Sequence, residues 1–514
     1  MMKKTILILL MSLVCMVSGA RVYVATDKSC YIAGDRIWCS VFSTGGPAVA
    51  YLELISTDGP AARTRIDLRH GRGGGSLLIP PETPTGNYRL YAYTGPGDLG
   101  HDGPVLSVFN TFSTARVKDG VEIADEMEGS SYVQTGYGLA VSTGGKLLLE
   151  NTSGSTVSCC ISLRREDSLR GTGFSSIAGF EPGAPAPEST GETILAALVG
   201  RDASAVAARV ADDSTGVYAL LAVPGSKTDC YAGSTRSDGL FSFSTENIFG
   251  SHDMAFMLGG LMDGEQCHLE PVSPFLTPAA AGIPKLKICR SMEADLLRRS
   301  ASLMETAPSD TVSVTLPLRR EHFFLTHECV SYILDDYTRF PTMEEVFVEI
   351  TPNVKLRRPG GRPQVYVLMN TSVLDAIPRW GKAIVMIDGV PVLDQKLLET
   401  YDPAIVKVVE VYPYKYEMGG KTFDGVVNLA TFSGRMPGVL FDDNVRIYDF
   451  PGCSWPQEHR GGETLFWSPL VSLGPGQTIE IPAEGMTDST AYTISAEGLT
   501  ASGSPVYLTK TFVR

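Results

Sequence analysis

The chain has 514 residues, of which 43% are hydrophobic and 19% are charged, and this composition indicates folded domains and excludes a disordered chain. At about 150 residues a domain, the length suggests three or four domains. The net charge of −14 argues against a nucleic-acid-binding protein, and no basic stripe interleaved with aromatic residues occurs along the sequence. The 53 glycines and 32 prolines favour many short strands joined by turns.

The first twenty residues have the pattern of a secretory signal peptide. Two lysines precede an apolar run over residues 5–17, and small residues lead up to an expected cleavage after Ala20. Lipidation at Cys15 is an alternative, although Val14 is not the small residue that such sites favour. No later run reaches the roughly 18 apolar residues of a membrane helix. We therefore expect an exported protein, periplasmic or associated with the outer membrane, with no transmembrane segment in the mature chain.

Nine cysteines remain after the expected cleavage. Cys30 and Cys39 lie symmetrically about Gly34-Asp35, and a tight hairpin there would place them opposite each other. Two interpretations of this pair remain open: a disulfide, or two small buried apolar groups. No CxxC pair and no Cys/His spacing of the zinc type occurs in the sequence, so a disulfide framework and a zinc centre are not expected.

Residues 21–118 show the period-2 pattern of a β-sandwich, with turn residues about every ten positions. Thr26-Asp27-Lys28, Tyr31 and Gly34-Asp35 resemble the first strands of the macroglobulin-like sandwich, and Gly86-Asn87-Tyr88 resembles a later strand of it. This resemblance implies a macroglobulin-like fold for the first domain.

Three further units are predicted before residue 341. Residues 119–188 are strand-rich and end in a Pro/Gly/Ser-rich stretch, which indicates a second sandwich followed by a linker. Within residues 189–284, an Asp-Gly turn before Phe241 resembles the regulatory sandwich found beside carboxypeptidases. Residues 285–340 are expected to be a connector of helix and strand, with one helix over residues 285–304.

Residues 341–434 have an α+β pattern. Thr342 and Glu345 predict a capping box at the start of a helix, and a hairpin is expected to turn at 359–361. The unit resembles the plug domain of TonB-dependent outer-membrane receptors, because five pieces match that domain in order and spacing. The residues that carry this signature, to which structural roles are assigned, are Asp388, Gly389, Pro391, Asp402, Pro403, Gly419 and Gly425.

The end of the sequence departs from that receptor family. A receptor plug is followed by a large membrane barrel, whereas 80 residues follow Gly434. Apolar and polar residues alternate over 435–514 as in another sandwich, and the strand at Tyr492 has a pattern similar to that of the strand at Tyr88. We expect a C-terminal sandwich here, with residues 310–335 as candidates to complete it around an inserted plug-like unit.

Sequence motifs give no support for catalysis. The letters of the macroglobulin thioester occur in the wrong order at 264–267, and the glycine-rich stretch at 419–422 lacks the first glycine of a phosphate-binding loop. A metal site at His322 and His327 is less favoured than an ordinary edge strand. Asp388 and Asp394, in the stretch IVMIDGVPVLD, are interpreted as a turn residue and a helix cap. We expect no catalytic residue, no cofactor and no metal.

The order of units resembles a group of exported multidomain proteins of Bacteroidota. The expected fold is mainly β, with tandem macroglobulin-like or immunoglobulin-like sandwiches and a small α+β plug-like domain. The expected function is a non-enzymatic envelope protein that binds or scaffolds other proteins through sheet edges. The alternatives are an accessory of TonB-dependent uptake, and a macroglobulin-like inhibitor or an unrecognised hydrolase. Expected partners are other envelope proteins, among them an outer-membrane receptor complex, and not nucleic acid.

Overall fold

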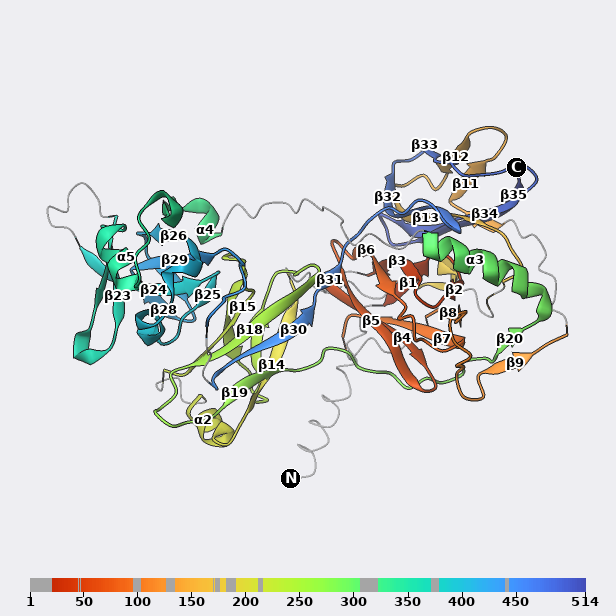
Figure 1. The fold of residues 1–514 in the computed structure, drawn as a ribbon. Helices are drawn as coiled ribbons and strands as arrows, with labels where there is room; N and C mark the ends of the chain where they lie inside the picture. Colours follow the sequence, from red (N-terminus) through yellow and green to blue (C-terminus); the bar gives the residue numbers. More distant parts are fainter. Residues whose placement is uncertain are drawn as a thin grey trace, which may run out of the picture.

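The structure is a computed structural model whose described residues are mainly strands, which confirms the expected mainly-β fold class. They form two lobes joined by several passes of the chain (Figure 1). The predicted signal peptide and Cys15 lie outside the described residues. The structure describes residues 21–514 except 45, 47, 96–102, 126–134, 170, 172–175, 182–190, 211–215, 306–321, 371–378 and 440–442.

The first sandwich (residues 21–117) packs a small sheet, in the order β1-β3-β6, against a larger sheet, in the order β2-β8-β7-β4-β5. Tyr31 and Tyr88 lie between the sheets and are at most 1% exposed. The alternating pattern therefore places its apolar residues inside, as predicted. The strands are β1 (Val22–Thr26), β2 (Cys30–Ile32), β3 (Arg36–Ser43), β4 (Val49–Ser56), β5 (Gly59–Asp67), β6 (Arg72–Leu78), β7 (Gly86–Tyr93) and β8 (Val105–Phe109).

The split sandwich (residues 135–165 and 464–513) joins two stretches that are far apart in the sequence. Strand β13 (Val157–Arg165) pairs on one side with β32 (Thr464–Leu473) and on the other with β34 (Ala491–Thr500). The predictions of one sandwich within 119–188 and a separate one within 435–514 are therefore wrong, because neither stretch closes a core alone. The remaining strands are β10 (Thr135–Tyr137), β11 (Leu139–Ser142), β12 (Leu147–Asn151), β33 (Thr478–Ile481) and β35 (Pro505–Val513).

The middle sandwich (residues 191–271 and 445–451) also takes a strand from late in the chain. Strand β30 (Val445–Pro451) pairs with β18 (Ser251–Gly259), so the unit is not confined to the continuous stretch 189–284 that the sequence predicts. Helix α2 (Ala203–Val210) contributes the buried Val206 to the core. The other strands are β14 (Thr193–Val199), β15 (Tyr218–Ala222), β16 (Cys230–Thr235), β17 (Phe241–Ser244) and β19 (His268–Pro271).

The connector is only partly helical. Strand β20 (Leu286–Ile288) pairs in parallel with β9 (Val121–Ile123), and helix α3 (Glu293–Glu305) begins after it. The prediction of one helix over 285–304 is therefore wrong at its start. The amide of Leu286 donates to the carbonyl of Gly120 at 2.8 Å, as part of the pairing between β20 and β9, and not within a helix. Helix α3 packs against β2 of the first sandwich.

The α+β unit (residues 322–436) has a sheet in the order β21-β26-β29-β24-β23-β22, and helix α5 (Met343–Glu349) contributes to its core. The predicted capping box is confirmed, since Thr342 and Glu345 each accept from the other's backbone amide. Residues 330–333 form β21 of this sheet, so the prediction that 310–335 completes a C-terminal sandwich is wrong where the chain is described; 310–321 lie outside the described residues. The other elements are α4 (Phe323–Thr326), β21 (Val330–Ile333), β22 (Val354–Arg357), β23 (Gln364–Leu368), β24 (Trp380–Ile387), β25 (Val390–Pro391), β26 (Val406–Tyr412), β27 (Tyr416–Met418), β28 (Lys421–Phe423) and β29 (Gly425–Thr431).

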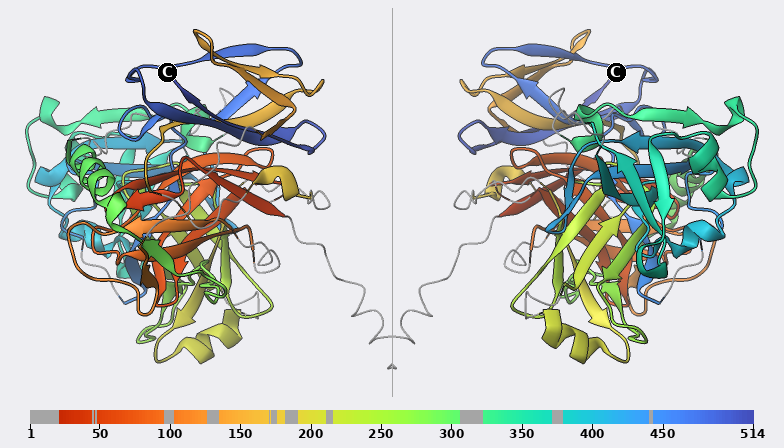
Figure 2. Two further views of the ribbon diagram at one scale, coloured as in Figure 1. Left: turned by 90° about the vertical axis from the view of Figure 1, so that its right-hand side faces the viewer. Right: turned by 90° about the vertical axis from the view of Figure 1, so that its left-hand side faces the viewer.

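The units are nested and do not follow one another along the chain. After the middle sandwich, residues 272–285 run back along the first sandwich, where Tyr91 donates to the carbonyl of Ala279 and Asn87 to that of Pro284. The chain then forms α3 and the α+β unit. It returns through β30 of the middle sandwich and β31 (Cys453–Ser454), at the edge of the first sandwich, and ends in the split sandwich with β32 and the strands after it. Figure 2 shows the resulting stack, with the split sandwich over the first sandwich.

Candidate functional site

The Thr26-Asp27-Lys28 motif forms a buried polar network between the first and split sandwiches. Asp27 is fully buried, and its Oδ1 accepts from the Tyr31 hydroxyl at 2.8 Å and from the Trp38 amide at 3.1 Å. Its Oδ2 accepts from the Thr464 hydroxyl of β32 at 2.6 Å. A carboxylate removed from water needs such donors, so Asp27 fixes the position of β32 against β1 and β3.

Lys28 lies between two carboxylates. Its Nζ is 3.2 Å from Asp27 and 3.0 Å from Asp35. Burial lowers the pKa of Lys28, but Asp27 and Asp35 together raise it above its ordinary value. The ammonium group therefore stays charged and holds the Gly34-Asp35 turn against the network.

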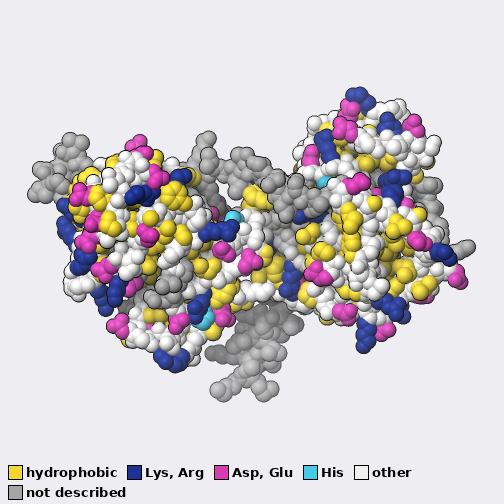
Figure 3. Space-filling view, in the orientation of Figure 1, with side chains coloured by type: hydrophobic (Ala, Val, Ile, Leu, Met, Phe, Trp, Pro, Cys, Tyr) yellow, Lys and Arg dark blue, Asp and Glu magenta, His cyan; other side chains and the backbone are white. Residues whose placement is uncertain are grey.

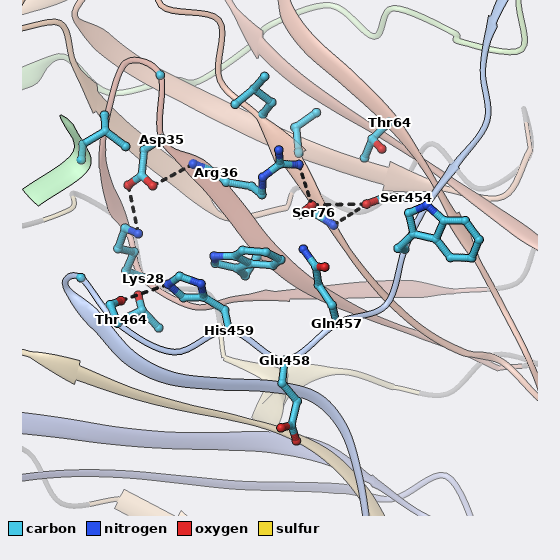
Figure 4. Close-up of a pocket in the computed structure, with 18 of the residues that line it drawn as sticks. Lys28, Asp35, Arg36, Thr64, Ser76, Ser454, Gln457, Glu458, His459 and Thr464 are labelled. Atoms are coloured by element: carbon cyan, nitrogen blue, oxygen red, sulfur yellow. Dashed lines mark hydrogen bonds and ion pairs between the residues drawn. The ribbon is translucent and has the colours of Figure 1, made fainter. Parts of the chain in front are cut away.

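A cavity of about 1010 Å³ opens beside this network, where the first sandwich, α3 and the returning segment 451–464 meet. Figure 4 shows Asp35 beside Lys28, Ser454 beside Ser76, and Gln457 and His459 on the returning segment. The Arg36 guanidinium donates to the Ser76 hydroxyl at 3.2 Å, and the Ser76 amide donates to the Ser454 hydroxyl at 2.8 Å. Hydroxyl, amide, guanidinium and carboxylate groups line the cavity together with apolar side chains, so it offers hydrogen-bonding groups to a ligand without being a purely polar site.

His459 serves this cavity as a packing residue. Its ring stacks on Trp38 with centroids 4.9 Å apart and planes 18° apart. Its Nε2 lies 3.0 Å from the carbonyl of Gly461, and burial lowers the pKa of His459. The ring is therefore neutral near pH 7, with its Nε2 proton directed to a backbone carbonyl and not toward the serines of the cavity.

Helix α3 holds one wall of the cavity through two arginines. Arg299 donates to both carboxylate oxygens of Asp167, at 2.7 and 2.9 Å, and to the carbonyl of Cys30 at 2.7 Å. Arg298 contacts Asp167 at 2.9 Å and also pairs with Glu463. This arrangement joins α3, the first sandwich and the segment before β32, so it fixes the shape of the cavity.

The residues of the plug-like signature lie elsewhere, in the α+β unit, and the structure gives several of them structural roles. The Asp388 carboxylate is buried and accepts from the amide and hydroxyl of Thr431 and from the amide of Met436, at 2.6–2.8 Å. Gly389 follows at φ 83°, and a Cβ there would lie 2.4 Å from the carbonyl oxygen of Ser226 in the middle sandwich. The Asp388-Gly389 turn is therefore a packing contact between two units.

The remaining signature residues are spread over the same unit. Asp402 caps a short 3₁₀ turn that begins at Pro403, and Asp394 caps another, as expected for Asp394. Pro391 ends β25, Gly419 lies in the β27–β28 turn, and Gly425 begins β29. They do not meet at one point, which is consistent with the structural interpretation of IVMIDGVPVLD.

Cys30 and Cys39 are both free, so the disulfide considered for them is not formed in this structure. The expected hairpin does not exist, because β2 and β3 belong to opposite sheets of the first sandwich. Cys39 lies in the core of that sandwich, whereas Cys30 lies in a separate cluster beneath α3. Both are small buried apolar groups, the other interpretation that the sequence left open.

Two further observations concern ligands and membranes. In the described part of the chain, no three His, Cys, Asp or Glu side chains are grouped closely enough to hold a metal ion. His322 caps α4, and the His327 ring stacks on Phe323 with centroids 4.4 Å apart, so both histidines have packing roles. Among the described residues, no helix is both long enough and apolar enough to span a membrane.

The sequence interpretation identified one side of the cavity and missed the other. Lys28 and Asp35 belong to a motif that resembles the macroglobulin-like sandwich, whereas Ser454, Gln457 and His459 belong to no motif. Their stretch, 453–463, contains one strand of two residues, β31, and has no periodic pattern, so no local signal marks it.

No protein-family model matches the sequence, and no curated protein matches it. Trypsin-activated alpha-2-macroglobulin of Escherichia coli is similar in structure, with 10% identity, a TM-score of 0.24, and coverage of 96% of this chain and 41% of that chain. A mutant of Salmonella alpha-2-macroglobulin has 9% identity, a TM-score of 0.23, and coverage of 96% and 39%. The chain thus spans about two fifths of the length of these macroglobulins. At TM-scores this low, the similarity assigns neither a function nor a partner to this chain.

Proposed function

We propose that this protein is a non-enzymatic, exported scaffold of the cell envelope that binds other proteins through open sheet edges of its α+β unit. The observation that carries the proposal is the edge strand β21. It pairs only with β26 in the described part of the chain, and Val330 and Ile333 are 42% and 45% exposed. An open strand edge with exposed apolar side chains is a natural template for a strand of another protein.

The nested fold supports this role, because ion pairs between the units hold the α+β unit, and with it β21, in place. A buried ion pair joins the first and middle sandwiches: Arg65 donates to Glu192 at 3.0 Å, and both side chains are at most 4% exposed. The middle sandwich and the α+β unit are joined by Lys227 and Glu410, 2.7 Å apart. Contacts of this kind limit the relative motion of the units, so that a bound partner would be held at a defined position.

A finer proposal concerns the partner. The resemblance of residues 341–434 to a receptor plug favours an outer-membrane receptor complex, which would make the protein an accessory of TonB-dependent uptake.

Site-specific photocrosslinking in the producing cells tests the proposal. A photoreactive side chain at Ser331, exposed on β21, is expected to capture a discrete protein of the envelope fraction. Glu150 is the matched control, because it is also exposed but lies on β12, which has a neighbouring strand on each side. Capture at Ser331 and not at Glu150 would support edge binding, and recovery of a receptor would support the finer proposal. Equal capture at both positions, or none at Ser331, would contradict it.

A further inference from the structure

Three strands at the far end of the α+β unit combine their side chains into a basic and aromatic face. In the ladder, Tyr366 of β23 lies opposite Lys355 of β22 and opposite Lys382 of β24. Lys355 Nζ lies 4.1 Å from the ring centroid of Trp380, and the Arg357 guanidinium lies 4.9 Å from that of Tyr366. Figure 3 shows Lys and Arg side chains along the outer margin of this lobe.

The cations of this face are not neutralised by neighbouring acids. Lys355, Arg357 and Lys382 are exposed, and none has a carboxylate within ion-pair distance among the described residues, whereas nearby Arg358 pairs with both Glu344 and Glu399. Stacking on aromatic rings holds the cations of Lys355 and Arg357 above the sheet without cancelling their charge. On a chain whose net charge is −14, this face is therefore complementary to an anionic partner.

The same face borders an open strand edge. Strand β22 is the last strand of its sheet and pairs only with β23 in the described part of the chain. The amide of Leu368 donates to the carbonyl of Asn353 at 2.9 Å, so these two residues form a hydrogen-bonded pair, and every second pair along β22 and β23 is bonded in the same way. Bonded and non-bonded positions alternate in an antiparallel pair, so the N–H and C=O of Leu356 point away from β23.

We propose that this edge binds an extended acidic peptide segment of a partner protein, added as a further strand beside β22. A peptide residue bonded to Leu356 would place its two neighbours opposite Lys355 and Arg357, on their face of the sheet. Acidic residues two positions apart in the peptide would therefore meet two cations two positions apart on the protein. This inference rests on the proposed protein-binding function and names the chemistry of one partner segment, at the edge opposite β21.

The test uses the full chain and a fluorescent nine-residue peptide in which glutamate alternates with valine or threonine. Binding is measured by fluorescence anisotropy at low salt and is expected to weaken as salt rises. The double variant Lys355→Glu/Arg357→Glu is expected to bind at least tenfold more weakly. Its matched control, Arg116→Glu/Lys118→Glu, makes the same change of charge at two exposed residues on either side of Val117, where the first sandwich ends, and is expected to change binding less than twofold.

Two further arms separate strand addition from simple charge attraction. The same peptide, N-methylated at alternate residues to remove the amides that would face β22, keeps its charge and is expected to bind at least tenfold more weakly. Amide hydrogen exchange over residues 354–357 is expected to slow when the unmodified peptide is bound. Equal binding by the N-methylated peptide would overturn the proposal, as would stronger binding of polygalacturonate or single-stranded DNA than of the peptide. These outcomes concern β22 alone, so they are distinguishable from a failure of crosslinking at β21.

Discussion

Glu497 is expected to make the stability of the junction between the first and split sandwiches depend on pH. It lies on β34 and is 6% exposed, and its carboxylate accepts from the Tyr23 hydroxyl at 2.7 Å. Burial raises the pKa of Glu497 from 4.5 to about 7, although the hydrogen bond from Tyr23 opposes the rise. Because the folded pKa is higher than the unfolded one, the stabilisation is complete below pH 4.5 and is lost as the pH rises through about 7. This pKa difference corresponds to about 3 kcal/mol.

The variant Glu497→Gln keeps the shape of the side chain and removes its titration. Relative to the parent, its free energy of unfolding is expected to increase by about 3 kcal/mol between pH 4.5 and pH 8. Urea unfolding followed by tryptophan fluorescence measures this, since Trp38 and Trp467 lie at the same junction. Glu480→Gln, on the exposed surface of the same sandwich, is the control and is expected to show no such trend. A constant difference between Glu497→Gln and the parent across this range would refute the reasoning.

Three further substitutions test single packing arguments, each by urea unfolding. Asp388→Ala leaves the buried amide and hydroxyl of Thr431 without their acceptor and is expected to lower the free energy of unfolding by about 3 kcal/mol. Asp388→Asn keeps one acceptor oxygen and is expected to lower it by less. Thr342→Ala removes the cap of α5 and is expected to cost about 1 kcal/mol; no loss would mean that the cap is redundant. Gly74→Ala places a Cβ 2.4 Å from Cβ of Pro469 and is expected to cost about 1–3 kcal/mol by forcing β6 and β32 apart, while an unchanged stability would show that the two sheets can separate freely.

The candidate site could be predicted only in part. Lys28 and Asp35 stand close together in a recognisable motif, and one side of the cavity follows from them. Thr464, which completes the environment of Asp27, lies 437 positions further along the chain. Hydrogen bonds between such distant residues depend on which sheets pack together, and no local pattern carries that information.

The sequence by itself determined the local structure of this protein. Alternation marked strands such as β12 and β23, whose buried and less buried residues alternate. The Thr342 and Glu345 pair started α5, and the glycines at 360 and 361, with φ of 63° and 81°, turned the β22–β23 hairpin. Each of these features depends on residues a few positions apart.

Only the tertiary structure decided which strands are neighbours. Backbone ladders are nearly independent of side-chain identity, so alternation says which residues of β13 share a face but not that β32 and β34 flank it. For the same reason the nested order of the units, the separation of Cys30 from Cys39, and the basic face shared by three strands were settled by packing. The cavity beside Lys28 and the open edge at β22 are products of that packing.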